Sequence, residues 1–358
     1  MGTKFDEMKV AFVIDDLIVR DTAIELLEVL LGLFPNSTIY TFAHKEGAIL
    51  GPVEQRRIVS TYLSQKIDKL EDWKKYQFLI SNAKEQIVVP CSYELCIKFS
   101  RGLAHVVPVC DGVPVFTYYF DRTRLDLPKT LLRQKFFHAM VKHLAQMAAV
   151  QGTNNYFASK QIKETYTSSG EDDIIYPGVN RAEFKPFPEE LIASMGGRTL
   201  TLIDTTDLEK SALLLSLVQK LKANGHDFYF VGPFDHEEVL RDLGIEESRF
   251  MRNKCSGELA PLMHRARVLI SLASETFPEV VLMARASHTP VTMIGENVAY
   301  QDLLDQVKVN RAPLDEAVVI QDYPNEDLAA GIADKEVWKK EIFQKINKTL
   351  VSFKKAKS

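Results

Sequence analysis

Short apolar runs rich in β-branched residues alternate with helical patterns along most of this chain. The first run, Lys9–Ile14, is followed by the helical pattern Thr22–Leu33 and by a second run at Ser37–Phe42. Continuous apolar runs are typical of strands that a parallel sheet buries on both faces. Strands that alternate with helices predict right-handed crossovers and a doubly wound α/β sheet. We expect Asp15 and Asp16 to end the first strand.

The alternation occurs in two series. In the first, further strands are expected at Arg57–Tyr62, Glu94–Ile97, Val113–Tyr119 and Asn155–Ser159, and a long helix at Leu131–Val150. The pattern stops at 175–188, where three prolines and a glycine without periodicity predict a joint between domains. The second series predicts strands at Thr199–Ile203, Asp227–Val231, Arg249–Met251 and Val268–Leu272, with helices at Leu208–Ala223, His236–Leu243, Leu259–Ala266 and Val280–Ala286. Residues 334–355 predict one closing amphipathic helix.

Composition narrows the class of protein. A chain of 358 residues exceeds what one hydrophobic core usually supports, so two domains are expected. The net charge of −4 gives no electrostatic case for binding nucleic acid. The four cysteines show no metal-ligand spacing, and we expect free thiols in a reducing cytoplasm. Neither a signal peptide nor a transmembrane run is recognisable, so a cytoplasmic protein is expected, at most peripheral to the inner membrane face.

The segment 271–291, SLASETFPEVVLMARASHTPV, combines a strand end, an acidic turn, a helix and a second strand. It resembles the signature of retaining family 4 glycosyltransferases, E-x-F-G-(x)5-E-A-x-A-x-G-T-P-V. The matching residues are Glu275, Phe277, Ala284, Ala286, Thr289, Pro290 and Val291.

Framework matches in the expected order extend the resemblance over nearly the whole chain, closest to the mannosyltransferase-like branch. They are Leu33–Thr41 (LFPNSTIYT), Tyr93–Ser100 and Ile174–Asn180. The resemblance implies the GT-B fold: two Rossmann-like doubly wound domains that face each other across a cleft. It assigns 1–178 to an N-terminal acceptor-side domain and 179–333 to a C-terminal donor-side domain, while the helix of 334–358 crosses back to the first.

Several positions depart from the family pattern. Pro278 replaces the signature glycine, Met283 the second glutamate, and His288 a later glycine. Phe120 stands where the branch has a histidine beside the reacting sugar. In the phosphate motif G-R-x-x-x-x-K, which corresponds to 204–210, only the lysine is kept, as Lys210. Proline at the start of a helix offers no N–H group to a phosphate.

The resemblance implies transfer of a hexose from a nucleotide sugar to a glycan or lipid-linked acceptor, with retention and without metal or other cofactor. It places Glu275, Phe277 and Lys210 at the donor. On the other domain, Arg124 would balance phosphate charge, and Arg101 or Asp121 would face the acceptor. No residue is assigned as catalytic. The alternative for each of these polar residues is an ordinary surface, capping or salt-bridge role.

The departures motivate a second hypothesis from a different class, a catalytically inactive GT-B scaffold that binds or assembles with an active glycosyltransferase. A dinucleotide-dependent enzyme is not supported, because no G-x-G-x-x-G follows the first strand of either domain. Residues 125–147 form a basic amphipathic stretch with two interpretations. It is either a membrane-surface helix or a core-packed helix with a solvated basic face.

Overall fold

The structure is a computed structural model of the chain. It describes residues 5–120, 131–144, 150–155, 158–160, 162–163, 173–205, 211–232, 244–251, 254–272, 277–295, 300–306, 309–313 and 334–357. The chain forms two compact units, one of Met1–Tyr176 with Lys339–Ser358 and one of Pro177–Trp338. Within the described residues no helix is long and apolar enough to cross a membrane.

The first unit is built on a parallel sheet of seven strands in the order β3-β2-β1-β4-β5-β6-β7. The strands are β1 Val10–Leu17, β2 Ser37–His44, β3 Arg57–Ser60, β4 Leu95–Ser100, β5 Val115–Tyr119, β6 Val150–Thr153 and β7 Asp173–Ile174. Because the order reverses direction at β1 and β4, the sheet is doubly wound, as predicted.

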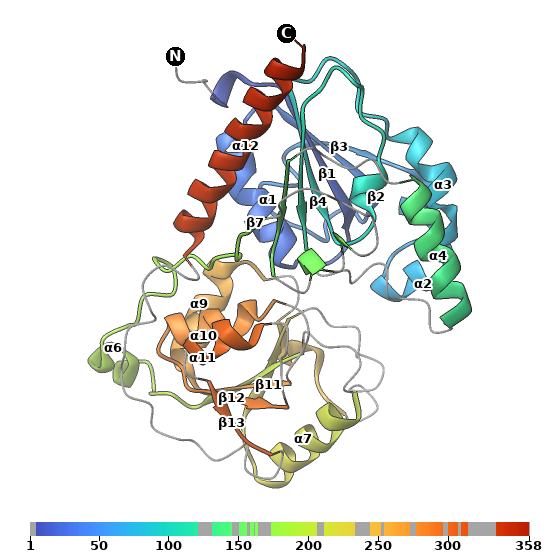
Figure 1. The fold of residues 1–358 in the computed structure, drawn as a ribbon. Helices are drawn as coiled ribbons and strands as arrows, with labels where there is room; N and C mark the ends of the chain where they lie inside the picture. Colours follow the sequence, from blue (N-terminus) through green and yellow to red (C-terminus); the bar gives the residue numbers. More distant parts are fainter. Residues whose placement is uncertain are drawn as a thin grey trace. The chain divides into compact units, whose positions relative to one another are not determined.

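Helices cover both faces of this sheet (Figure 1). They are α1 Thr22–Leu33 and α12 Lys335–Lys357 on one face, and α2 Trp73–Tyr76, α3 Ile80–Ala83 and α4 Leu131–Leu144 on the other. Phe5 joins α12 to the first face, since its ring lies 5.7 Å from that of Phe34 and 5.0 Å from that of Phe343. On the other face, Phe137 and Val141 of α4 enter the main core.

Helix α1 has the predicted bounds for a local reason. Asp21 caps it by accepting hydrogen bonds from the backbone N–H groups of Ala23 and Ile24. The prediction for β1 was wrong, because the strand continues through Asp15 and Asp16 to Leu17. Both aspartates are fully buried, and their carboxylates are satisfied inside the protein.

The strand expected at Asn155–Ser159 is also misplaced. The structure puts β6 at Val150–Thr153, and Ala158 is already helical. The described part of α4 ends at Leu144. Gly152 explains why β6 was missed, since a Cβ there would lie 3.1 Å from the ring of Tyr118. Gly152 adds nothing to the apolar pattern of the strand, and its tight packing against a distant ring is not visible in the local sequence.

Two of the four cysteines are not free thiols, contrary to expectation. Cys91 and Cys110 form a disulfide with their Cα atoms 5.2 Å apart, whereas Cys96 and Cys255 are free. Val89 and Val109 form a parallel bridge next to it, which brings the two cysteine loops into bonding range. The disulfide joins the loops that precede β4 and β5.

The second unit contains a parallel sheet of six strands in the order β10-β9-β8-β11-β12-β13. The strands are β8 Leu200–Asp204, β9 Phe228–Val231, β10 Phe250–Met251, β11 Ala266–Leu272, β12 Val291–Ile294 and β13 Asn310–Arg311. Its helices are α6 Glu189–Ser194, α7 Ser211–Ala223, α9 Ser256–Arg265, α10 Glu279–Ala286 and α11 Gln301–Gln306. The helix expected at His236–Leu243 lies outside the described residues.

The predicted joint is held by a close backbone contact. Val179 forms a parallel bridge with Asp334, and the N–H of Lys335 donates to the carbonyl of Val179 at 3.1 Å. A Cβ on Gly178 would come within 2.5 Å of the carbonyl oxygen of Asp334. Only glycine allows this approach between the joint and the start of α12.

We predict that Gly178→Ala lowers the free energy of unfolding by at least about 2 kcal/mol, because backbone atoms have to move apart. Gly32, in an exposed turn of α1 with no heavy atom within 4 Å of an added Cβ, provides the control. Gly32→Ala should stabilise the chain by about 0.5–1 kcal/mol. Urea denaturation of both variants checks this, and equal effects would contradict the contact.

Candidate functional site

Ligands of doubly wound sheets bind at the carboxyl ends of the central strands. In the first unit this edge begins with Asp15, near the end of β1. Its carboxylate accepts hydrogen bonds from the backbone N–H groups of Arg101 at 2.6 Å, Ala104 at 3.0 Å and Leu103. These donors belong to the turn after β4. They form the kind of concavity that binds an anion, and a buried side chain of the protein fills it.

Arg101 stands in the same turn with its guanidinium buried. Its Nη2 donates to the carbonyl of Asp16 at 2.7 Å and to the carboxylate of Asp16 at 3.2 Å, while Nη1 donates to Asp21. Burial by itself would lower the pKa of Arg101, but the carboxylates of Asp16, Asp21 and Asp15 outweigh it and raise that pKa. Arg101 is only 2% exposed. Its contact with an acceptor stays a prediction, and the pairing of its guanidinium with internal carboxylates does not favour that contact.

A buried lysine and histidine lie beside this turn. The Lys98 ammonium on β4 donates to the carbonyls of His105, at 3.1 Å, and Val107, at 2.7 Å. Nδ1 of His105 lies 2.9 Å from the hydroxyl of Ser100. Burial lowers the pKa of Lys98 to about 8, and burial together with the Lys98 charge lowers the pKa of His105 to about 3. His105 is therefore neutral at physiological pH.

Phe120, which replaces the expected histidine, belongs to an aromatic cluster. Its ring lies 4.8 Å from that of Tyr118 and 5.7 Å from that of Phe99. The side chain is 5% exposed. Phe120 therefore serves as packing at the end of β5 and has no group for proton transfer.

In the second unit the corresponding edge is formed by the ends of β8 and β11. Asp204, at the position of the first glycine of the phosphate motif, accepts a hydrogen bond from the hydroxyl of Ser271 at 2.9 Å. The N–H of Thr205, where the family has arginine, donates to the carbonyl of Val231 at 3.1 Å. A carboxylate and a neutral hydroxyl thus occupy positions where the family has a glycine and a cation.

Helix α10 follows this edge. Pro278 is its N-cap and supplies no side-chain hydrogen bond, and the N–H of Glu279 donates to the carbonyl of Phe277 at 2.9 Å. Phe277 is buried against Tyr300, with ring centroids 5.5 Å apart. Met283 is also buried, at 3% exposure. The start of α10 therefore has apolar surroundings, and the N–H group of Glu279 is engaged in a hydrogen bond within the chain.

His288 lies just beyond the last turn of α10, at φ 57°. The N–H of Thr289 closes the helix by donating to the carbonyl of Ala284 at 2.8 Å. The left-handed conformation at His288 explains why the family pattern has glycine at this position. His288 thus adopts a conformation that the glycine of the family pattern would adopt more easily.

Of the predicted site residues, Arg101 and Phe277 lie in the described part of the chain, and each packs inside its own unit. Glu275, Lys210, Asp121 and Arg124 lie outside the described residues. Among the described residues, no group of three or more His, Cys, Asp or Glu side chains is arranged to hold a metal ion.

Sequence reasoning missed the Asp15, Asp16 and Lys98 contacts. The sequence did carry a signal, since these charged residues lie within or directly after strongly apolar strands. A charged side chain in a strand that is buried on both faces requires partners inside the protein.

Comparison with known proteins supports the fold. No protein-family model matches the sequence, and no curated protein matches it in a sequence comparison. Solved structures do match. HepE from Anabaena, in complex with UDP and glucose, has a TM-score of 0.56 and 13% identity, over 96% of this chain and 93% of HepE.

Two other enzymes match over similar lengths. Sucrose-phosphate synthase from Thermosynechococcus elongatus has a TM-score of 0.53 and 13% identity, over 97% of each chain. UDP-N-acetylglucosamine 2-epimerase from Rickettsia bellii has a TM-score of 0.56 and 11% identity, over 97% of this chain and 98% of the epimerase. The chain has the GT-B fold, with two Rossmann-like units, and identities this low establish the fold alone.

We predict that Arg101→Met lowers the free energy of unfolding by about 3–5 kcal/mol, because three carboxylates lose their buried counter-charge. Arg249 is the matched control, since it pairs with Asp227 at 2.6 Å on the surface. Arg249→Met should cost less than about 1 kcal/mol. Urea denaturation measures both, and a small loss at Arg101 would show that the carboxylates are satisfied without it.

We also predict that acid destabilises the first unit through His105. Its folded pKa of about 3 lies below the ordinary 6.5, so only the unfolded chain takes up this proton between pH 6.5 and pH 3. Stability is therefore lost as the pH falls through that window, by as much as about 5 kcal/mol. His105→Gln should flatten this part of the pH profile measured by urea denaturation.

His143→Gln, at an exposed histidine of α4, is the control and should leave the profile unchanged. Burial also lowers the pKa values of His264 and His226 in the second unit, so His105→Gln retains the slope that these two residues contribute. An unchanged profile in His105→Gln would contradict the prediction.

Proposed function

We propose that the chain binds a nucleotide sugar, with UDP as the nucleotide, at the carboxyl edge of the second sheet, and takes part in glycosyl transfer. The observation that carries the proposal is the likeness to HepE over nearly the whole length of both chains, since that structure contains UDP and glucose. The epimerase of similar fold is also named for a UDP sugar. A UDP sugar is the chemistry that these two neighbours share.

The residue roles follow the family resemblance. Glu275 binds hydroxyls of the transferred sugar, and Lys210 and Arg124 balance the diphosphate charge. Asp121, with Arg101 as the second candidate, faces a glycan or lipid-linked acceptor. We propose retention of configuration, no metal, and a place in glycan or polysaccharide assembly.

A second candidate is a catalytically inactive scaffold that assembles with an active glycosyltransferase. Specific contacts favour it. The Phe120 ring packs in an aromatic cluster, and the N–H of Glu279 donates a hydrogen bond to the carbonyl of Phe277. In addition, Met283 is buried and provides no hydrogen-bond acceptor for a ribose. These features weaken donor binding and remove the expected histidine, but leave the fold intact.

Calorimetric titration with UDP, GDP and their sugars separates the two candidates. The first predicts binding of UDP and UDP-glucose in the micromolar to low-millimolar range. Glu275→Gln should leave UDP binding unchanged and weaken UDP-glucose by at least about tenfold, because a charged hydrogen bond to the sugar is lost. Glu279→Gln is the matched variant in the first turn of α10. It should strengthen UDP binding by about twofold to fivefold, because a negative charge near the phosphates is removed.

Folded protein that gives no heat with any nucleotide would reject the first candidate. Binding without release of UDP from UDP-glucose, in the presence of candidate acceptors, would favour the scaffold. Equal effects of Glu275→Gln on UDP and UDP-glucose would reject the role of Glu275 at the sugar.

A further inference from the structure

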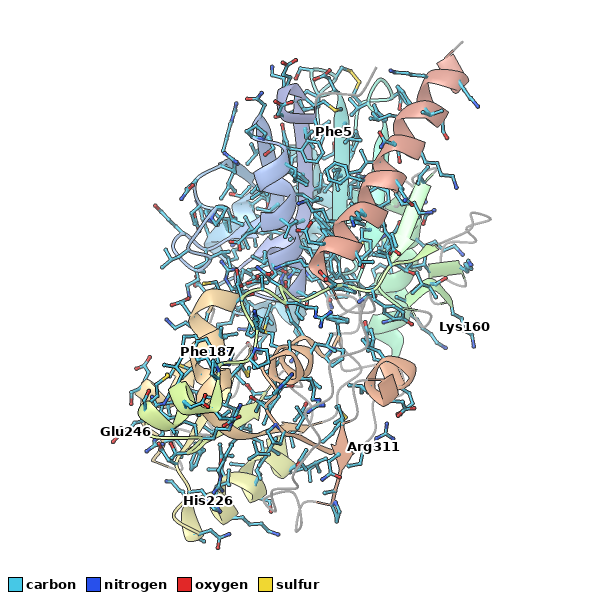
Figure 2. The ribbon with its side chains drawn as sticks, turned by 90° about the vertical axis from the view of Figure 1, so that its left-hand side faces the viewer. Phe5, Lys160, Phe187, His226, Glu246 and Arg311 are labelled. Atoms are coloured by element: carbon cyan, nitrogen blue, oxygen red, sulfur yellow. A yellow bond between two sulfur atoms is a disulfide. The ribbon has the colours of Figure 1, made fainter. Side chains whose placement is uncertain are left out.

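The disulfide between Cys91 and Cys110 lies at the amino edge of the first sheet. Cys91 comes shortly before β4 and Cys110 shortly before β5, and these neighbouring strands are parallel. Cys91 is exposed and Cys110 is half-buried, so the disulfide is at the surface of the unit (Figure 2, in which sulfur is yellow). A disulfide in such a place is within reach of a dissolved thiol.

The disulfide closes a loop that contains the turn after β4. From Cys91 the chain runs through β4, makes this turn at the carboxyl edge, and returns to Cys110 at the amino edge. The turn donates the three backbone hydrogen bonds that Asp15 accepts. The ammonium of Lys98 adds two hydrogen bonds to carbonyls of the returning segment. A closed loop has less entropy to gain when it opens, so the cross-link favours the anchored turn.

The two cysteine loops are also paired by contacts that do not involve sulfur. The N–H of Val89 donates to the carbonyl of Pro108 at 2.9 Å, and the N–H of Cys110 donates to the carbonyl of Val89 at 3.0 Å. Val89 and Val109, which form the bridge beside the disulfide, are both buried. Because these contacts survive reduction, they keep the two cysteines in bonding range, and the disulfide can form again.

The other two cysteines do not compete for this disulfide. Cys96 on β4 is fully buried, and burial raises the pKa of its thiol to about 12, so almost none of it is thiolate. Cys255 belongs to the second unit. Sγ of Cys110 accepts a hydrogen bond from the N–H of Gly112 at 3.5 Å, and such a donor favours a thiolate there. Cys110 is therefore suited to be the leaving sulfur.

We propose that Cys91 and Cys110 form a thiol–disulfide exchange site, opened by a dithiol reductant, whose redox state sets how firmly the turn after β4 is anchored. One thiolate of the dithiol attacks Sγ of Cys91, the S–S bond breaks, and Cys110 leaves as a thiolate. The second thiolate of the reductant then displaces Cys91. The dithiol is thereby oxidised to a disulfide, its two electrons reduce the two cysteines, and its two protons reach them through solvent. The oxidised dithiol reverses both steps.

The first measurement follows the disulfide in the folded full chain. The chain is incubated with dithiothreitol in the absence of denaturant, and free thiols are then alkylated and located by mass spectrometry. We expect alkylation of Cys91 and Cys110, no alkylation of Cys96, an unchanged circular dichroism spectrum, and closure again in oxidised dithiothreitol. A disulfide that is reduced only in urea would be a permanent structural link and would overturn the proposal, as would one that oxidised dithiothreitol does not restore.

The second measurement follows the turn. Hydrogen exchange is recorded for the amides of Arg101, Leu103 and Ala104 in the oxidised and the reduced chain. We expect exchange at least about tenfold faster after reduction, because loss of a cross-link over a loop of this size favours opening by up to roughly a hundredfold. Amides of α10, in the second unit, are the internal control and should not change. Equal exchange of the turn amides in both states would contradict the proposed coupling.

Serine variants test whether this pair is responsible. Cys91→Ser and Cys110→Ser should each give the fast exchange of the reduced chain and remove its dependence on dithiothreitol. Cys255→Ser is the matched control and should keep that dependence. Dependence that survives in the first two variants would overturn the proposal. If neither folds, the wild-type chain in its two redox states decides the question. No nucleotide takes part in these measurements, so their outcome is separate from that of the proposed function.

Discussion

The Asp15 carboxylate and its three backbone donors are the contact on which the first unit depends. Asp15 lies within a strand that is buried on both faces, so its charge requires partners inside the protein. The turn after β4 supplies them through the N–H groups of Arg101, Leu103 and Ala104. The same turn brings the Arg101 guanidinium to Asp16 and Asp21. Because Asp21 also caps α1, this network joins the two central strands to the first helix.

The same constraint explains what could be predicted from the sequence. Helix α1 was predicted to its exact bounds, since its periodicity and its Asp21 cap are both local signals. The end of β1 was not, because two aspartates after an apolar run resemble a strand end unless the distant turn that satisfies them is known. Strand β6 was missed for a related reason, as Gly152 packs tightly against the ring of Tyr118, a neighbour remote in sequence.

The end of α10 shows why the signature segment 271–291 keeps its fold although His288 replaces a glycine. His288 adopts the left-handed conformation that glycine adopts most easily, and α10 still closes through Thr289. A non-glycine residue in this conformation carries a modest energetic cost that a well-packed helix end can offset. Framework positions therefore tolerate substitution without loss of the fold. Resemblance to the family consequently predicts architecture more securely than it predicts the site.

Among the described residues, several backbone N–H groups at the carboxyl edge of each sheet bond inside the protein. In the first unit a carboxylate of the chain occupies the N–H groups of the turn after β4. In the second, the N–H of Glu279 bonds to Phe277, and Pro278 has none to offer. These described N–H groups are therefore already engaged and do not face a diphosphate or a charged acceptor. The resemblance gives Lys210 and Arg124 the role of holding phosphate charge, and under our proposal their side-chain cations supply what these backbone groups do not.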